Sequence, residues 1–363
     1  MLIAWGAESA QFFIAQGFAL AILALMQTLP EFAVEAVLAW KQQSPLLLAN
    51  LTGALRLLTG LAWPMIYVTS AVVYRRRVGQ PLRKITLHRH QSVEVMALIL
   101  PLFYGLFIWW KGQLHAYDAV VLVALYVVYL VLLTKLPPEE QEGIDDLEKI
   151  PQAIVKAPRN RRNFIIAALF LTGGTLIYFT AEPFLGSLVA VAAAVRIPSF
   201  VMIQWLAPVI SEFPELASTF YFAKQEEKAP MALMNIVSSN INQWTLLVAM
   251  LPVVFSISRG TPSAIVFDAE QRTELILTIG QSFAGLAFLL NMEFAWWEAA
   301  GMFGLFAAQF VLPSLLGSEA RMIIAVIFFV WAGLEFVRFL VRRPGHNAFV
   351  SFAETWREHV AGK

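Results

Sequence analysis

Hydrophobic residues fall into long runs along this chain, and short polar segments separate the runs. Most runs are about 20 residues or longer, the length that an α-helix needs to cross a bilayer. The pattern therefore predicts an all-α polytopic membrane protein with about ten transmembrane helices. The expected spans are 11–40, 45–73, 93–111, 116–135, 164–194, 197–223, 231–257, 273–291, 293–313 and 320–341. The fifth run is too long for an upright helix, so we expect it to tilt or to break at Glu182-Pro183.

The composition agrees with this class, because 59% of the 363 residues are hydrophobic and only 14% are charged. The chain has no cysteine, which excludes disulfides, thiol catalysis and cysteine metal sites. It has no H-E-x-x-H motif, and the only Asp within a span is Asp118, near the end of that span. A membrane-embedded hydrolase would lack metal ligands and nucleophiles, so we expect no enzymatic activity. The opening MLIAWGAESAQ lacks the basic region of a cleavable signal peptide.

The segments between the spans predict the orientation in the membrane. Residues 75–90 are strongly basic, which between two spans is typical of a cytoplasmic loop and not of nucleic-acid binding. The segment 136–163 has an acidic run but no D-x-D-x-D-G loop, so we interpret it as a solvated linker and not as a calcium sensor. With both termini in the cytoplasm, most Lys and Arg residues lie in cytoplasmic segments, as the positive-inside rule requires. We therefore expect a protein of the plasma or inner membrane in this orientation.

Polar residues interrupt the hydrophobic pattern in the spans 197–223 and 231–257. Glu212 and Glu215 flank Pro214, which has no N–H and disrupts the helix, so that the carbonyl oxygen of Ile210 is freed. Carboxylate, carbonyl and hydroxyl oxygens are the ligands that hard cations such as Ca²⁺ prefer. The next span carries Asn235, Ser239 and Asn242 on one helical stripe, with Ser238 and Gln243 at its edges. The alternative interpretation is that these small polar residues only hold helices together.

The same pattern occurs near the N-terminus. Residues 27–33 parallel 211–217, and residues 49–53 parallel 234–238. An internal repeat with an interrupted helix in each half indicates a transporter whose site lies at the membrane midplane. The two broken helices are the first and sixth spans, so they cross the membrane in opposite directions. We therefore predict two inverted repeats of the five-helix type, with Pro30 and Pro214 as helix-breaking residues.

These predictions divide the chain into five parts. They are a first transmembrane repeat (1–135), a cytoplasmic linker (136–163), a second repeat (164–318), an additional transmembrane helix (319–341) and a cytoplasmic tail (342–363). In the tail, the apolar residues Phe349, Phe352, Trp356 and Val360 share one face of a helix. We expect this amphipathic tail to lie on the membrane surface.

The two copies resemble the paired α-repeats of the cation/calcium exchanger superfamily, which includes sodium/calcium and calcium/proton exchangers. Each family repeat has a T-S-L-P-E-like break followed by G-N-x-x-G-S-N-x-x-N on the next helix. The breaks in this chain are Q-T-L-P-E (27–31) and S-E-F-P-E (211–215), and the following helices carry A-N-L-T-G-A-L-R-L-L (49–58) and M-N-I-V-S-S-N-I-N-Q (234–243). In the first copy, Ala54-Leu55 replaces the Ser-Asn pair and Leu58 replaces the last Asn.

The resemblance implies a secondary antiporter that exchanges a metal cation, expected to be Ca²⁺, for H⁺ or Na⁺ by alternating access. Its partners would be the lipid bilayer and inorganic cations, with no cofactor and no nucleic acid. The alternative is a non-exchanging protein, or a transporter of a different solute, that retains the exchanger fold. The eroded first copy keeps that alternative open.

Residue by residue, the resemblance predicts Glu31 and Glu215 as the central metal ligands, one from each repeat. Glu212 would add charge, and neutral oxygens would come from Asn50, Asn235, Ser238, Ser239 and Asn242. Glu35, Arg56 and Gln243 are predicted to modulate the site or to carry protons. Glu35 lies one turn beyond Glu31, so it either shuttles protons or extends towards the membrane boundary. Crowded carboxylates in a low dielectric cannot all ionise, so protons should compete with the metal, which favours H⁺ over Na⁺ as counter-ion.

Arg56 fits the family pattern least, and its permanent charge inside a membrane helix requires a partner. In one interpretation it is a tethered cation that pairs with Glu31 or Glu35. A helical wheel opposes this, because Arg56 lies on a different stripe from Asn50 unless the helix breaks at Gly53. In the other interpretation, Arg56 forms a structural salt bridge to another helix, for example to Glu8.

Overall fold

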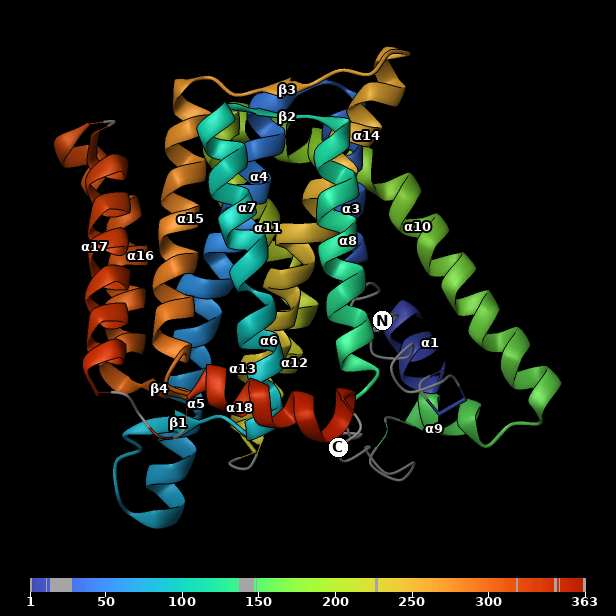
Figure 1. Ribbon diagram of the computed structural model, residues 1–363. Coiled ribbons are helices and arrows are strands. Elements are labelled where there is room, and N and C mark those ends of the chain that lie inside the picture. Colours follow the sequence, from blue (N-terminus) through green and yellow to red (C-terminus); the bar gives the residue numbers. More distant parts are fainter. Residues whose placement is uncertain are drawn as a thin grey trace.

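A computed structural model describes residues 2–10, 12–13, 28–136, 147, 149–225, 228–317, 319–342, 345 and 347–361. Most of these residues form a bundle of helices (Figure 1). The helices are α1 (Leu2–Ala10), α3 (Leu29–Trp40), α4 (Ser44–Leu57), α5 (Trp63–Val78), α6 (Ser92–Ala97), α7 (Ile99–Lys111), α8 (Ala116–Leu133), α9 (Lys149–Val155), α10 (Arg159–Ala194), α11 (Ser199–Ser211), α12 (Phe213–Ala223), α13 (Ala229–Asn242), α14 (Val248–Arg259), α15 (Ala269–Leu289), α16 (Trp296–Leu316), α17 (Glu319–Arg342) and α18 (Ala348–Thr355). Shorter turns are η1 (Leu58–Ala62), η2 (Arg89–Gln91), η5 (Gln243–Leu247) and η6 (Trp356–Val360).

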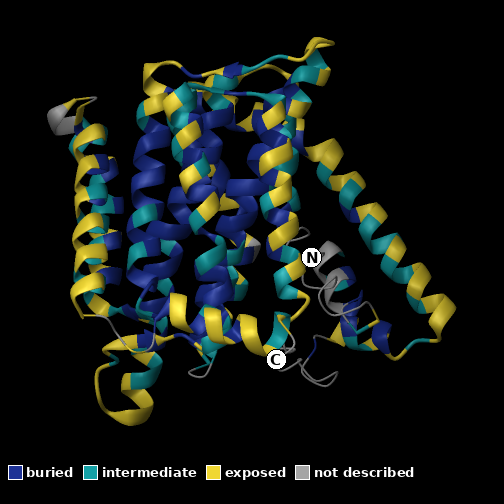
Figure 2. Cartoon of the chain, in the orientation of Figure 1, coloured by how far each residue is buried: buried dark blue, intermediate teal, exposed yellow. Residues whose placement is uncertain are grey.

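Six helical stretches of the described chain are long and apolar enough to cross a membrane. They are Ser44–Val78, Arg89–Lys111, Ala116–Leu133, Arg159–Ala194, Ala229–Arg259 and Glu319–Arg342, and the shorter Ser199–Ser211 is also apolar. Buried residues gather inside the bundle, whereas α10 and α17 expose apolar side chains over most of their length (Figure 2). Apolar surface of this extent is typical of helices that face lipid. The protein is therefore an integral membrane protein, as the hydrophobic pattern predicted.

Two pairs of very short strands were not predicted from the sequence. At one end of the bundle β1 (Lys84–Thr86) pairs antiparallel with β4 (Glu293–Ala295), and at the opposite end β2 (Gln113–Leu114) pairs with β3 (Ile265–Val266) (Figure 1). Strands of two or three residues are too short to produce a recognisable alternation of polar and apolar positions. Each pair joins the first half of the chain to the second. We refer below to the β1–β4 end and the β2–β3 end of the bundle.

Two of the long helical stretches contain a turn of π-helix in their middle. In the first half, η1 lies between α4 and α5; in the second half, η5 lies between α13 and α14. A π turn holds one residue more than an α turn, so it rotates the side chains that follow it relative to a regular helical wheel. Such turns often occur at functional sites.

Helix α10 is tilted and unbroken, whereas the sequence allowed either a tilt or a break at Glu182-Pro183. It runs without interruption for 36 residues with Pro183 inside it, so the predicted break at Glu182-Pro183 is wrong. A helix of this length spans about 54 Å at 1.5 Å per residue, well beyond the roughly 30 Å of a hydrocarbon core. Figure 1 shows the helix strongly inclined to the rest of the bundle, which accommodates the excess length. Glu182 lies on its exposed surface and pairs with Lys41 at 2.5 Å.

The linker and the C-terminal tail pack against other helices more than the sequence predicted. Residues 14–27, the first part of the first predicted span, and the acidic run 137–146 lie outside the described residues. The remainder of the linker is not simply solvated, because α9 packs on α1 and buries Pro151, Ile154 and Val155. The tail helix α18 packs on α6 and η2 across the β1–β4 end (Figure 1) and exposes part of its apolar face, including Phe349.

Candidate cation-binding site

The two predicted breaks lie at the candidate site, and the helices that follow them, α3 and α12, begin with the same backbone geometry. Thr28 precedes α3, and Glu212 separates α11 from α12; their backbone angles agree closely, with φ/ψ of −88°/−2° and −86°/−3°. Pro30 and Pro214 each lie in the first turn of the helix that follows. Proline is tolerated there because the N–H of a first-turn residue has no helical acceptor. The prolines therefore start new helices at these breaks.

Three carboxyl groups from the two halves of the chain meet at these breaks. Glu31, Glu212 and Glu215 are 1%, 3% and 2% exposed. Glu212 is in hydrogen-bonding contact with both Glu31 and Glu215. An ionised carboxylate can only accept hydrogen bonds, so two carboxyl groups in contact must share a proton or a cation. The arrangement can therefore hold either.

Gln243 joins the carboxyl groups of the two halves. Its Nε2 donates to Glu31 Oε2 at 2.7 Å and to Glu212 Oε1 at 2.9 Å. The sequence predicts Gln243 at the edge of the polar stripe, as a modulating residue, whereas the structure places it at the centre of the cluster. Gln243 begins the π turn η5, which a regular helical wheel does not represent.

The other polar residues of α13 divide into those that face the cluster and those that do not. Ser239 donates to Glu215, and Asn242 Nδ2 donates to Thr28 Oγ1 at 2.6 Å. Ser238 instead forms a hydrogen bond of 2.9 Å with the hydroxyl of Tyr129 on α8. Asn235 is half-buried, and its Nδ2 has no hydrogen-bond partner among the described residues. The structure thus brings Ser239 and Asn242 to the breaks and leaves Ser238 bonded to a different helix.

Glu35 and Asn50 form a second polar pair. Asn50 Nδ2 donates to Glu35 Oε1 at 3.0 Å, so Asn50 is bonded to Glu35 and not to Glu31. Glu35 is fully buried, so the interpretation that it extends to the membrane boundary is wrong. The free carboxyl oxygen of Glu35 and the amide oxygen of Asn50 have no hydrogen-bond partner in the described part of the chain. This pair lies one helical turn from Glu31 along α3.

Arg56 lies in a different polar cluster. Its guanidinium pairs with Glu274 Oε2 on α15 at 2.5 Å and donates to Gln309 Oε1 on α16 at 3.1 Å. Pairing with Glu31 or Glu35 as a tethered cation is therefore wrong, and the salt-bridge interpretation is correct with Glu274 as partner. The side chain of Glu8, the partner suggested from sequence, lies outside the described residues. Helix α4 also continues through Gly53 without a break.

Gly53 instead marks the crossing of α4 with α11. A Cβ at this position would overlap the carbonyl oxygen of Gln204, so only glycine allows the two backbones to approach this closely. Pro208 has no N–H to donate to that same carbonyl. The Gln204 carbonyl thus loses its helical partner where it faces Gly53.

We expect Gly53→Ala to destabilise the protein by about 1–3 kcal/mol, because overpacking against a backbone atom cannot be relieved by a rotamer change. The measurement is thermal unfolding of the purified protein in detergent. The control is Gly304→Ala on α16, where an added Cβ would meet no atom within 4 Å. That variant should keep or slightly raise stability, since alanine favours a helix over glycine. Equal stability of the two variants would contradict the close crossing.

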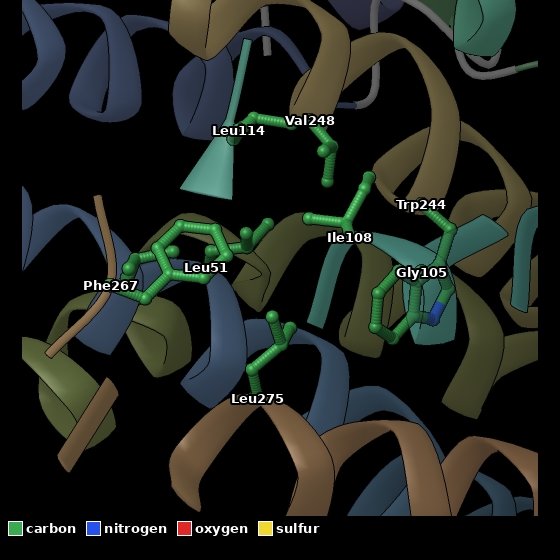
Figure 3. A pocket seen from close by; sticks show the side chains of 9 residues that line it. Leu51, Gly105, Ile108, Leu114, Trp244, Val248, Phe267 and Leu275 are labelled. Atoms are coloured by element: carbon green, nitrogen blue, oxygen red, sulfur yellow. The ribbon is translucent and has the colours of Figure 1, made fainter. Parts of the chain in front are cut away.

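A small apolar cavity of about 20 Å³ separates η5 from the strands of the β2–β3 end. Figure 3 shows the side chains of Leu51, Ile108, Trp244 and Phe267 around it. Apolar cavities of this kind stay dry. Trp244, which lines this cavity, follows Gln243 directly in the chain.

No group of three or more acidic or histidine side chains among the described residues is arranged as a formed metal site. The carboxyl groups of Glu31, Glu212 and Glu215 are in contact with one another, with Gln243 and with Ser239. Glu31 Oε1, Glu215 Oε2 and Gln243 Oε1 have no hydrogen-bond partner among the described residues, so these oxygens are available as ligands for a divalent cation.

Comparison with known proteins identifies the family. The model of the family described as "Sodium/calcium exchanger protein" matches residues 5–135 and 165–315. A search of curated proteins finds no match. Among solved structures, the H⁺/Ca²⁺ exchanger CAX is 32% identical, with 98% of this chain and 87% of that chain covered and a TM-score of 0.87.

Two further structures share the fold at lower identity. Native YfkE is 13% identical, with 91% of this chain and 88% of that chain covered and a TM-score of 0.58. The sodium-calcium exchanger NCX_Mj is 17% identical, with 85% of this chain and 94% of that chain covered and a TM-score of 0.54. Since the family model matches well over half of the chain, the protein belongs to the sodium/calcium exchanger family, within the cation/calcium exchanger superfamily that its repeats resemble.

Proposed function

We propose that the protein is a secondary antiporter that exchanges Ca²⁺ for H⁺ across the membrane by alternating access. The observation that carries this proposal is the contact of three buried carboxyl groups, Glu31, Glu212 and Glu215, at two helix breaks from opposite halves of the chain. The H⁺/Ca²⁺ exchanger CAX, with which the chain shares 32% identity, supports the choice of ions. Cation/calcium antiport is common to the family, so we assign no enzymatic activity.

Protons and Ca²⁺ compete for the same carboxyl groups, and this competition couples the transport of one ion to that of the other. In the cluster as described, each contact between two carboxyl groups is satisfied when one of them donates a proton to the other. Ca²⁺ requires the same groups ionised, because its affinity depends on the number of charged ligands. Binding of Ca²⁺ therefore expels protons and binding of protons expels Ca²⁺. Glu31 and Glu215 are the central ligands in this proposal, with Glu212, Ser239 and Asn242 beside them and Gln243 bridging the two halves.

Sodium coupling is the less favoured choice of counter-ion. Ala54, Leu55 and Leu58 occupy first-half positions where the family pattern has Ser or Asn, so fewer neutral oxygens remain to coordinate Na⁺. Glu35 and Asn50 offer one further carboxyl and amide pair on α3 and α4, which we assign to proton or cation passage.

We further propose ten transmembrane helices in two inverted repeats with the boundaries predicted above. Three observations support the repeats. The π turns η1 and η5 occupy the same place in the two halves, and Gly79 and Gly260 end the corresponding helices in the left-handed conformation. The first strand of each half pairs with the second strand of the other half, at opposite ends of the bundle.

The orientation follows from charge. The basic end of α5, the segment around β1 and the tail α18 all lie at the β1–β4 end (Figure 1). We therefore place this end, with both termini, in the cytoplasm and the β2–β3 end outside. The largest part of this positive charge comes from the last turn of α5, which holds Arg75, Arg76 and Arg77.

The test is ion flux in reconstituted vesicles that contain the purified protein. We expect an imposed pH gradient to drive Ca²⁺ uptake and an imposed Na⁺ gradient at constant pH to drive little. Empty vesicles and vesicles with a proton ionophore are the controls. Uptake that depends on the Na⁺ gradient alone would reverse the assignment of the counter-ion. Absence of Ca²⁺ flux under both gradients would favour the alternative, a protein that keeps the exchanger fold without calcium exchange.

A further inference from the structure

A second buried polar cluster lies on the other side of α4 from Asn50. We name it the Arg56 cluster; its members are Arg56, Thr59, Gln204, Glu274, Gln281 and Gln309, all at most 5% exposed. Gln204 Nε2 on α11 donates to Glu274 Oε2 at 2.8 Å. Gln309 Nε2 donates to Gln281 Oε1 at 2.9 Å, and Gln281 Nε2 donates to Thr59 Oγ1 at 2.5 Å. The cluster thus links α4, α11, α15 and α16 through side chains.

The cluster reaches the surface at the β2–β3 end. Arg321, at the start of α17, pairs with Glu274 Oε1 at 2.8 Å and with the exposed Glu270 at 3.1 Å. Glu274 therefore lies between two arginines, one fully buried and one partly exposed. Two guanidinium groups hold the Glu274 carboxylate in place, so Glu274 is a fixed acceptor.

Helix α11 makes one contact with Glu274 and two with α4. Gln204 donates to Glu274, the ring of Trp205 lies 4.9 Å from the Arg56 guanidinium carbon, and the Gln204 carbonyl faces Gly53. Helix α12, beyond the break at Glu212, packs instead on α5 and α13. The two halves of the broken helix are thus held by different sets of helices.

The Arg56–Glu274 ion pair costs much more to break than the Gln204–Glu274 hydrogen bond. Separating Arg56 from Glu274 would leave two unpaired charges in a low dielectric, which makes that pair effectively permanent. The Gln204 amide is neutral, so its hydrogen bond to Glu274 can break and re-form at a modest cost.

The position in the second half that corresponds to Arg56 is Ile241. This residue is apolar, so the described part of the second half has no matching charge there.

We propose that the contacts of Gln204 with Glu274 and of Trp205 with Arg56 form a latch that holds α11 against α4 and α15, and that release of the Gln204–Glu274 hydrogen bond opens the carboxyl cluster to the β2–β3 end. Gln204, Glu274 and Arg56 are then positioning residues that act on Glu212 and Glu215 through α11. The inference rests on the proposed alternating-access function, because it assigns a role to α11 in exposing that site.

The absence of cysteine makes a direct test available, since a single introduced thiol has no background. Ala207 is fully buried on α11, one turn from Gln204, and Ala207→Cys changes its size little. The readout is the rate of labelling by a membrane-impermeant maleimide added from the side that the β2–β3 end faces. In the Ala207→Cys background, Gln204→Leu should raise this rate about tenfold, the factor expected for loss of a hydrogen bond to a charged group.

The matched control is Gln309→Leu, which removes another hydrogen bond to Arg56 but lies on α16 and not on α11. It should leave the labelling rate unchanged, with thermal unfolding confirming that both variants fold. Equal labelling in the two variants, or no increase in a folded Gln204→Leu protein, overturns the latch. If Gln204→Leu does not fold, Trp205→Leu is used in its place. It should raise the labelling rate by the same factor, and a folded Trp205→Leu protein without that increase overturns the latch. Labelling does not depend on Ca²⁺ flux, so the latch and the exchange function can fail separately.

Discussion

Replacing either Glu31 or Glu215 with Gln is expected to abolish Ca²⁺ uptake driven by a pH gradient in reconstituted vesicles. Glutamine keeps the shape of glutamate but removes a charge from a site in which both side chains are at most 2% exposed. Calcium affinity follows the number of charged ligands, so we expect binding to weaken by about a hundredfold or more. The measurements are ⁴⁵Ca²⁺ uptake and Ca²⁺ affinity of the purified protein.

The chain contains a matched control for this experiment. Glu182 is also next to a proline in the chain, Pro183, but it lies on the exposed surface of α10 and pairs with Lys41. Glu182→Gln should therefore leave Ca²⁺ uptake close to that of the unmodified protein. Full uptake in both the Glu31→Gln and Glu215→Gln proteins would remove these residues from the proposed site.

Replacing Arg56 with Met is expected to lower the free energy of unfolding by about 3–5 kcal/mol, because it leaves Glu274 without its fully buried partner. Thermal and denaturant unfolding in detergent measure the loss. The double variant Arg56→Met, Glu274→Met should recover most of it, since an apolar pair of similar volume can replace a buried ion pair at little cost. A single variant as stable as the unmodified protein would show that the ion pair is not required for stability.

The helix breaks and the acidic residues at them could be predicted from the sequence because their chemistry is local. Pro30 and Pro214 disrupt any helix that precedes them, and Glu31 and Glu215 follow directly in the chain. An ionised group in an apolar span also predicts function without knowledge of its neighbours. These signals located the two proline segments whose carboxyl groups the structure brings together.

The partners across the bundle could not be predicted in the same way. Arg56 required a buried partner, but Glu274 is 218 residues away, and nothing in the periodicity of either helix connects the two. Gln243 was assigned to the edge of its stripe because the helical wheel of one helix does not show the carboxyl groups of Glu31 and Glu212 that meet it from other elements. Asn50 was predicted by analogy as a neutral ligand of the cation site, whereas packing places it beside Glu35. Each error concerns a contact set by three-dimensional packing and not by local sequence.

The two strand pairs have a consequence for the synthesis of the chain. Lys84 pairs with Ala295 and Gln113 with Val266, so each first-half strand waits for a partner that is made more than 150 residues later. At roughly 5–20 residues per second, a ribosome reaches Ala295 about 10–40 s after Lys84 has been made. During that interval both edges are open to wrong partners, and their shortness and the charge of Lys84 limit such pairing. Neither end of the bundle can close until most of the protein has left the ribosome.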